Sequence, residues 1–370
     1  MIFPSPFGEG QGEGLKVSMR LLSGSFRFGE AQPTETEKAK FGSYSALSFA
    51  PSPSPLPKVE GETCRQRFPA ALQCKRMSLL AIENYVAVPL PIACAVAGIL
   101  GAIIGSFLNV VIHRVPREQS IVFPNSACPS CHTALRPYDN IPILSFLILR
   151  GRCRYCRKAI SIRYPIVEGL TALLFVGVAL HDGTSFALPF DLAFVAALLA
   201  LIFIDAEHMI LPNVITYPGI LFALLTRIAL PYLVGPAQFD DLPGLILRFP
   251  PNFPLWTVSL IGAAIGALVG GGSLWLMGFV WEKLRGVEAM GLGDVKMMFM
   301  VGAYLGWRLA ALTIFFGVLS GSLIGIAIMM KAGKRNMQMM LPFGIFLGVG
   351  AIASLLFGHF VVNWYASQFR

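Results

Sequence analysis

The chain has 370 residues, of which 55% are apolar and only 13% are charged, with a formal net charge of +9 and a mean hydropathy of +0.67. A soluble domain of this length rarely shows that balance, so the composition excludes an ordinary soluble enzyme or binding module. Several apolar runs approach or exceed the roughly 20 residues that a helix needs to cross a bilayer. The sequence therefore predicts an all-α, polytopic membrane protein with about eight transmembrane helices.

Residues 1–76 do not share the pattern of the rest of the chain. They are rich in Gly, Pro and Ser and show no sustained helical or strand period, which predicts disorder. No apolar core follows their scattered basic residues, so the layout is not that of a signal peptide. We interpret Met77 as the start of the protein and residues 1–76 as a misassigned extension. A functional basic tail is the alternative.

The first predicted span lies within residues 77–113. Small residues recur in it every four positions, at Ala97, Gly101 and Gly105, and this spacing lets two helices approach closely. The segment that follows, residues 114–163, contains nine Lys or Arg residues and only two acidic ones. Because a short loop this basic stays in the cytoplasm, we expect the first span to run from outside to inside.

The same basic segment contains two Cys-x-x-Cys pairs separated by 21 residues. Two such pairs supply four thiolates for a tetrahedral zinc ion, and a closed four-thiolate site is structural rather than catalytic. Two disulfides are the alternative, which a reducing cytoplasmic loop disfavours. The predicted metal ligands are Cys128, Cys131, Cys153 and Cys156.

Residues 164–370 are predicted to form the membrane core, with seven further spans. Glu168 lies near the start of the second span, where a helix cap and a functional role both stay open. The third span ends at Asp205, and a short sixth span begins at Asp294. Two crossings separate these acids. Counting crossings therefore predicts that both carboxylates lie at the cytoplasmic boundary, although they are far apart in sequence.

Two carboxylates that converge on one water molecule can act as general base and general acid, provided that they share one proton. Asp294 is flanked by Gly291, Gly293 and Lys296, and the glycines would let an extended substrate strand approach closely beside it. Two independent helix caps are the plain alternative. An ion-coupled transporter also needs carboxylates in its membrane domain. Against transport, both acids lie at one face and no inverted repeat is visible.

Seven motifs occur together and in order. They are Gly105–Pro116 (GSFLNVVIHRVP), the two cysteine pairs, Asn140-Ile141-Pro142, Arg163–Glu168 (RYPIVE), Asp205 with Leu211-Pro212-Asn213, Gly291–Lys296 (GLGDVK) and Leu341–Gly344 (LPFG). Over about residues 80–365 the chain thereby resembles the bacterial type IV prepilin peptidases, also called prepilin leader peptidase/N-methyltransferases. One departure is Arg157, directly after the last cysteine, where relatives commonly have glycine.

The resemblance implies a bifunctional enzyme of the bacterial inner membrane. Its peptidase half belongs to the glycine-x-glycine-aspartate membrane aspartyl proteases, and by motif the catalytic pair falls on Asp205 and Asp294. The implied reaction removes the basic leader from type IV prepilins or type II secretion pseudopilins at the cytoplasmic face. The implied partners are these substrates and the lipid bilayer, with no nucleic acid.

The second implied reaction methylates the new N-terminal residue, with S-adenosyl-L-methionine as methyl donor. The sequence shows no glycine-rich nucleotide fingerprint of the soluble methyltransferase type. This activity therefore rests on the resemblance, which associates the cytoplasmic cysteine loop with methylation and metal binding and implies that the four cysteines are its scaffold. The residues that bind the donor stay unknown.

The implied leader is basic, and the large loop is basic as well and would repel it. Binding of the leader therefore needs negative charges nearby. The available carboxylates are Glu168, Glu207 and the aspartate pair, and we hypothesise that Glu168 or Glu207 helps to seat the leader. Besides the peptidase and the transporter, a non-enzymatic assembly scaffold stapled by zinc is the third interpretation. That scaffold predicts that cysteine substitutions matter and aspartate substitutions do not.

Overall fold

The computed structural model describes residues 88–368, apart from residues 125, 129, 240, 251, 287–290 and 333–341. These residues all belong to one compact unit, Phe68–Arg370. No β-strand occurs within them, which confirms the all-α prediction. The extension that we predict to be disordered, residues 1–76, and the proposed start at Met77 lie outside the described residues.

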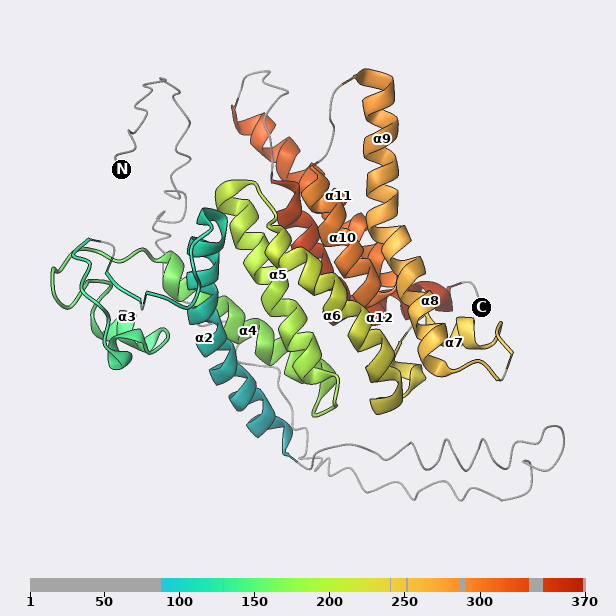
Figure 1. Ribbon diagram of the computed structural model, residues 1–370, viewed down its shortest axis with the longest axis horizontal. Helices are drawn as coiled ribbons and strands as arrows, with labels where there is room; N and C mark the ends of the chain where they lie inside the picture. The colour runs from blue at the N-terminus through green and yellow to red at the C-terminus, as the bar shows by residue number, and fades with distance from the viewer. Residues whose placement is uncertain are drawn as a thin grey trace, which may run out of the picture. The chain divides into compact units, whose positions relative to one another are not determined.

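Within the described part of the chain, seven helices are long and apolar enough to cross a membrane, and each lies where the sequence predicts a span (Figure 1). They are α2 (Leu90–Arg114), α4 (Arg163–Asp182), α5 (Leu188–His208), α6 (Asn213–Leu233), the continuous run α8, η5 and α9 (Leu255–Ala267, Leu268–Gly272 and Ser273–Arg285), α11 (Trp307–Ala332) and α12 (Phe343–Ser367). Between α6 and α8 the chain forms η4 (Pro236–Gln238) and α7 (Leu242–Ile246).

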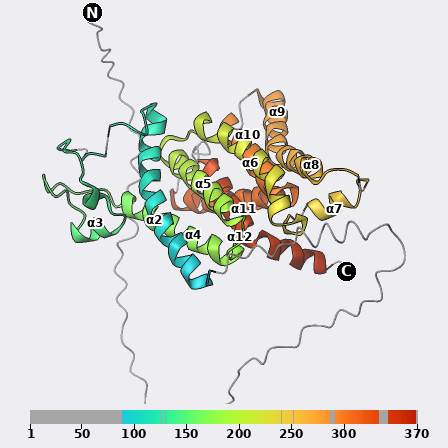
Figure 2. The same cartoon turned by 60° about the horizontal axis from the view of Figure 1, so that its bottom comes forward.

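The eighth predicted span is α10 (Leu292–Leu305), and it is short. Its 14 residues rise about 21 Å, less than the roughly 30 Å of a bilayer's hydrocarbon core. Nearly every residue from Val295 to Leu305 is buried, because α6, α8, α11 and α12 all contact this helix. Figure 2 shows α10 among these neighbours. Protein rather than lipid therefore surrounds α10, which explains how so short a helix is accommodated.

Glycines set the distance between the helices that flank the two aspartates. Gly266 of α8 and Gly302 of α10 face each other so closely that a Cβ on either would overlap the carbonyl oxygen of the other. Gly101 of α2 approaches α4 in the same way, since a Cβ there would lie 2.7 Å from the Ala172 Cα. The predicted role of four-residue glycine spacing in close helix packing is confirmed. The fifth span, in contrast, contains the π-helical turn η5, which no pattern in the sequence predicts.

The basic loop connects α2 to α4 and contains η2 (Val115–Arg117), η3 (Pro137–Asn140) and α3 (Leu144–Ile148). In Figures 1 and 2 it lies beside these two helices. A hydrogen bond fixes it there, because the backbone N–H of Ile143 donates to the Glu168 Oε2 of α4 at 2.7 Å. The loop is thus attached to α4 by a hydrogen bond as well as by the covalent chain.

Candidate active site and metal centre

Asp205 lies in the last turn of α5, and its side chain is buried. The helix ends because Met209 adopts a left-handed conformation (φ 53°) and donates its N–H to the Asp205 carbonyl at 2.9 Å. Pro212 then precedes the first residue of α6. The Asp205 Oδ2 accepts a hydrogen bond of 3.1 Å from the backbone N–H of Ile345, in the first turn of α12. The carboxylate is therefore held in one orientation by the start of another helix.

Asp294 lies in the first turn of α10, as predicted, and is partly buried. Gly291 occupies the N-cap position in an extended conformation, which turns the chain into the helix. No hydrogen-bond donor to the Asp294 carboxylate occurs among the residues that the structure describes. The two acids therefore differ in environment, since only Asp205 receives a backbone N–H.

The two carboxylates meet at Gly344. A Cβ atom placed on this glycine would lie 2.7 Å from the Asp205 Oδ2 and 3.1 Å from the Asp294 Oδ1. Both oxygens thus approach the same point, from α5 and from α10. Two acids that are remote in sequence share one site, which meets the geometric requirement for acting on a single water molecule.

The residues that flank Asp294 have different surroundings. Gly291 is exposed, and a Cβ there would find its nearest neighbour, the Asp294 Oδ2, only at 4.0 Å. Gly293 is helical, and its bare face packs on Leu211, whose Cβ would lie 3.0 Å from an added Cβ. The space beside Gly293 is thus filled by protein rather than free for a substrate strand. Lys296 donates to the Asn213 Oδ1 at 2.9 Å, linking the starts of α10 and α6.

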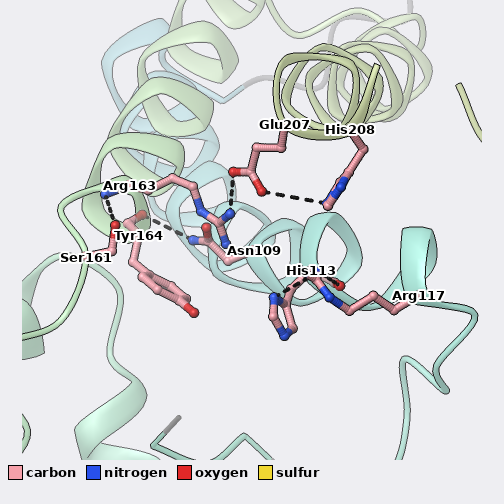
Figure 3. A network of polar contacts seen from close by, with 8 residues as sticks. All are labelled: Asn109, His113, Arg117, Ser161, Arg163, Tyr164, Glu207 and His208. Carbon is pink, nitrogen blue, oxygen red and sulfur yellow. Dashed lines mark hydrogen bonds and ion pairs between the residues drawn. The ribbon is translucent and has the colours of Figure 1, made fainter. Parts of the chain in front are cut away.

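The two glutamates are both engaged. Glu168 lies beyond the first turn of α4, so it does not cap this helix, which was one of the two roles that the sequence left open. Its carboxylate accepts the hydrogen bond from the Ile143 N–H. Glu207, two residues after Asp205, forms an ion pair with Arg163 at the start of α4 (Figure 3). His208 lies on the other side of Glu207, with 4.0 Å between the His208 Nε2 and the Glu207 Oε2. The end of α5 that bears Asp205 is thereby tied to the junction of α4 with the basic loop.

The four predicted metal ligands lie together, their sulfur atoms all within 4.8 Å of one another. The Cys128 and Cys156 sulfurs are 3.8 Å apart. Four sulfurs placed about 2.3 Å from a central zinc ion in a tetrahedron would also lie about 3.8 Å apart. The donor set and its spacing therefore fit a structural metal ion. Cys94, in α2, is free and remote from this group in sequence.

The two cysteine pairs share one backbone design. The N–H of His132 donates to the Cys128 carbonyl at 2.9 Å, and the N–H of Arg157 donates to the Cys153 carbonyl at 3.0 Å. His132 and Arg157 both have positive φ, 55° and 59°. Side-chain and backbone hydrogen bonds from Thr133 lower the pKa of Cys131 to about 6, which favours the thiolate that a metal ion needs.

Sequence reasoning singled out the two aspartates and the four cysteines, and the structure brings each set together, but it gave no role to Gly344 or Ile345. The LPFG motif was visible, and a glycine in the first turn of the last span was the available signal. The motif could not reveal its role, because nothing in the sequence shows that this turn lies between Asp205 and Asp294.

The comparisons with known families agree with this geometry. The profile of the bacterial peptidase A24 N-terminal domain matches residues 99–181, which cover the basic loop with its flanking helices. The profile of the type IV leader peptidase family matches residues 192–326, which include both aspartates. No solved structure matches the chain significantly.

Among curated proteins, the chain is similar to several prepilin leader peptidase/N-methyltransferases. That of Pseudomonas aeruginosa is 34% identical over 290 residues, which cover 72% of this chain and 91% of the relative. That of Burkholderia pseudomallei is 33% identical over 75% of this chain and 89% of the relative. That of Myxococcus xanthus is 40% identical, with 64% of each chain covered. The chain therefore belongs to the prepilin leader peptidase/N-methyltransferase family.

Proposed function

We propose that Asp205 and Asp294 are the catalytic pair with which this multi-pass membrane protein cleaves the leader from type IV prepilins or type II secretion pseudopilins. The observation that supports this is their convergence at Gly344, where one added atom would contact both carboxylates. Two carboxylates so close cannot both ionise cheaply, so the pair holds one shared proton. That is the starting state for hydrolysis by an aspartyl protease.

The different environments of the two acids suggest their roles. Asp205 accepts the Ile345 N–H and keeps the negative charge, so it removes a proton from water as that oxygen attacks the carbonyl carbon of the leader. Asp294 then gives its proton to the departing amide nitrogen. The peptide C–N bond breaks, and no covalent bond to the enzyme forms.

The charge of the basic loop supports a cytoplasmic active site. The loop carries nine Lys or Arg residues between positions 114 and 163, and such loops stay inside the cell. The Arg163–Glu207 pair places the end of α5 beside this loop. We therefore assign the protein to the bacterial inner membrane, with the aspartate pair at its cytoplasmic side.

We further assign zinc to the four-cysteine site, where Cys128, Cys131, Cys153 and Cys156 would hold it. When bound, the ion would staple the two halves of the loop together. All four ligands come from the protein, so this site has a structural and not a catalytic role.

The peptidase assignment is tested by following cleavage of a tagged prepilin in membranes. Asp205→Asn and Asp294→Asn are each expected to lower the cleavage rate at least about a hundredfold, since each removes half of an acid–base pair. Asp191→Asn is a matched control, because Asp191 is also buried in α5 but lies at its other end. If the protein were a transporter or a scaffold, cleavage of prepilin would not depend on Asp205 or Asp294. Cleavage at the parental rate in both aspartate variants would therefore overturn the assignment.

The leader also needs a counter-charge near the aspartate pair. Of the two glutamates, Glu207 is the better candidate, because its side chain is 29% exposed whereas Glu168 is buried. A basic leader residue could compete with Arg163 for it. Glu207→Gln is expected to weaken binding of a leader-length peptide at low salt more than Glu168→Gln does. Equal affinities in both variants and the parent would contradict this role.

A further inference from the structure

A groove of about 830 Å³ lies between α2 and the basic loop, which runs beside the half of α2 that ends at Arg114 (Figures 1 and 2). We call it the α2 groove. Its α2 wall includes Ile99, Ile103 and Phe107, whose side chains are 65%, 55% and 49% exposed. The loop contributes four more exposed apolar side chains, those of Ile121, Val122, Ile141 and Leu144. Large apolar side chains from two separate segments therefore face a space that the described part of the protein leaves open.

The residues of α2 that line the groove form one stripe along the helix. At 3.6 residues per turn, the three apolar side chains and that of Arg114 fall within an arc of about 80°. Gly101 and Gly105 lie on the opposite side of α2, where both pack closely on α4. The stripe is thus the side of α2 that faces away from α4.

The stripe has the length of one bilayer leaflet. Arg114 lies 15 positions after Ile99, which corresponds to about 22 Å along the helix axis. Half of a bilayer, with its headgroup region, is about 20–22 Å thick. With Arg114 at the membrane surface, the α2 groove therefore extends from the headgroups to about the centre of the bilayer.

The end of the groove at Arg114 is positively charged. Arg114 donates to the carbonyl of Ser120 at 2.9 Å and to that of Pro124 at 2.6 Å, which holds the loop against the end of α2. Both acceptors are uncharged, and within the described residues no carboxylate forms an ion pair with Arg114. A guanidinium has five N–H groups, so these two bonds leave donors for an anion. The loop as a whole is also basic, with nine Lys or Arg residues and two acidic ones between positions 114 and 163.

We propose that the α2 groove binds an anionic phospholipid, with the phosphate at Arg114 and an acyl chain along Ile103 and Phe107. An apolar wall one leaflet long that ends in an unpaired positive charge matches such a lipid in length, polarity and charge. An apolar helix, of a substrate or of a second copy of this chain, would cover the apolar wall but would not by itself supply an anion for Arg114. The inference goes beyond the proposed activity, because it involves neither Asp205 nor Asp294.

Native mass spectrometry of the full-length protein in detergent tests the charge, with phosphatidylglycerol and phosphatidylcholine titrated separately. Both lipids have a phosphate, but only phosphatidylglycerol has a net negative charge. The parent is expected to bind phosphatidylglycerol about fivefold more tightly, and Arg114→Gln is expected to abolish this preference. Arg117→Gln is the matched control, because it removes the same charge from a nearby residue that does not line the groove, and it is expected to keep the preference.

Two further variants test the apolar wall and the role of the charge. Ile103→Trp fills part of the groove and is expected to weaken binding of both lipids at least about fivefold. Ile92→Trp is its control, since Ile92 is 53% exposed on the same helix but lies outside the groove. Arg114→Lys keeps the charge without the planar fork and is expected to keep the preference for phosphatidylglycerol. The elution profile in detergent reports whether each variant is folded.

Equal affinity of the parent for the two lipids would overturn the proposal, as would parental binding in Ile103→Trp. A loss of preference in Arg117→Gln or Arg114→Lys as large as in Arg114→Gln would also overturn it. Benzoylphenylalanine in place of Ile103 identifies the occupant by photocrosslinking in membranes that contain prepilin. A lipid adduct is expected, whereas a cross-link to prepilin or to a second copy of the chain would contradict the lipid site. None of these measurements depends on cleavage, so their outcome is independent of the peptidase assignment.

Discussion

Gly344 shows how a single missing side chain makes room for chemistry. Its position beside Asp205 and Asp294 leaves a gap that any Cβ would fill. The first turn of α12 therefore belongs to the proposed active site, although it bears no acid or base.

Gly344→Ala is expected to reduce prepilin cleavage at least tenfold, because the methyl group would press on both carboxylates. The rate of cleavage in membranes is the measurement. Gly177→Ala provides the comparison, since a methyl group on this helical glycine would meet its nearest neighbour, the Leu356 Cδ1, at an ordinary 3.9 Å. If both variants cleave at the parental rate, Gly344 is not needed for access to the pair.

Single residues also mark where sequence reasoning succeeded and where it stopped. The Cys-x-x-Cys spacing predicted four ligands that do converge, because short-range spacing fixes the geometry of each pair. The unusual Arg157 now has a physical context, since its φ of 59° is a conformation that glycine adopts without strain. The engagement of Glu168 by Ile143 was not predictable, because that contact depends on how the loop folds back.

At the scale of elements, α10 is positioned by its neighbours rather than by its own length. Glycines let α8 and η5 approach α10 closely, as the contacts of Gly266 and Gly270 with it show. The apolar run after Asp294 predicted a short helix here, although the sequence analysis began it at Asp294 and the structure begins it two residues earlier, at Leu292. The sequence could not show that protein encloses α10 on all sides, because burial depends on the packing of α6, α8, α11 and α12 around it.

Gly302→Ala is expected to destabilise the protein by about 1–3 kcal/mol and to lower cleavage, because the added methyl group would overlap the Gly266 carbonyl and displace α10. Thermal unfolding in detergent and prepilin cleavage measure the two effects. Gly272→Ala is the control, since its Cβ would lie 3.6 Å from the Leu268 Cδ2, an ordinary contact. Similar behaviour of the two variants would argue against the glycine crossing as the determinant of α10's position.

At the scale of the whole molecule, we expect the basic loop and the helices to differ in what stabilises them, although contacts such as Ile143–Glu168 connect the two. The loop has few regular elements, and its four cysteines bring its two halves together. The membrane helices have their own continuous apolar core. Removing the metal should therefore loosen the loop without unfolding the helices.

Chelation of the purified protein is expected to increase trypsin cleavage within residues 115–162 at least tenfold while the helical circular dichroism stays unchanged. Cys153→Ser should have the same effect and abolish metal content, measured by elemental analysis. Cys94→Ser should retain the metal, because Cys94 lies in α2 outside the cluster. Retained protease resistance after complete metal loss would show that the loop does not depend on the ion.

The hydrogen bond from Ile345 to Asp205 has a consequence for biosynthesis. Helix α12 supplies this donor and the neighbouring gap, so α12 must be translated before the proposed catalytic pair is complete. A partly inserted chain would hold its two acids without the backbone that orients them. Proteolytic competence would thus appear only once α12 has docked against α5 and α10.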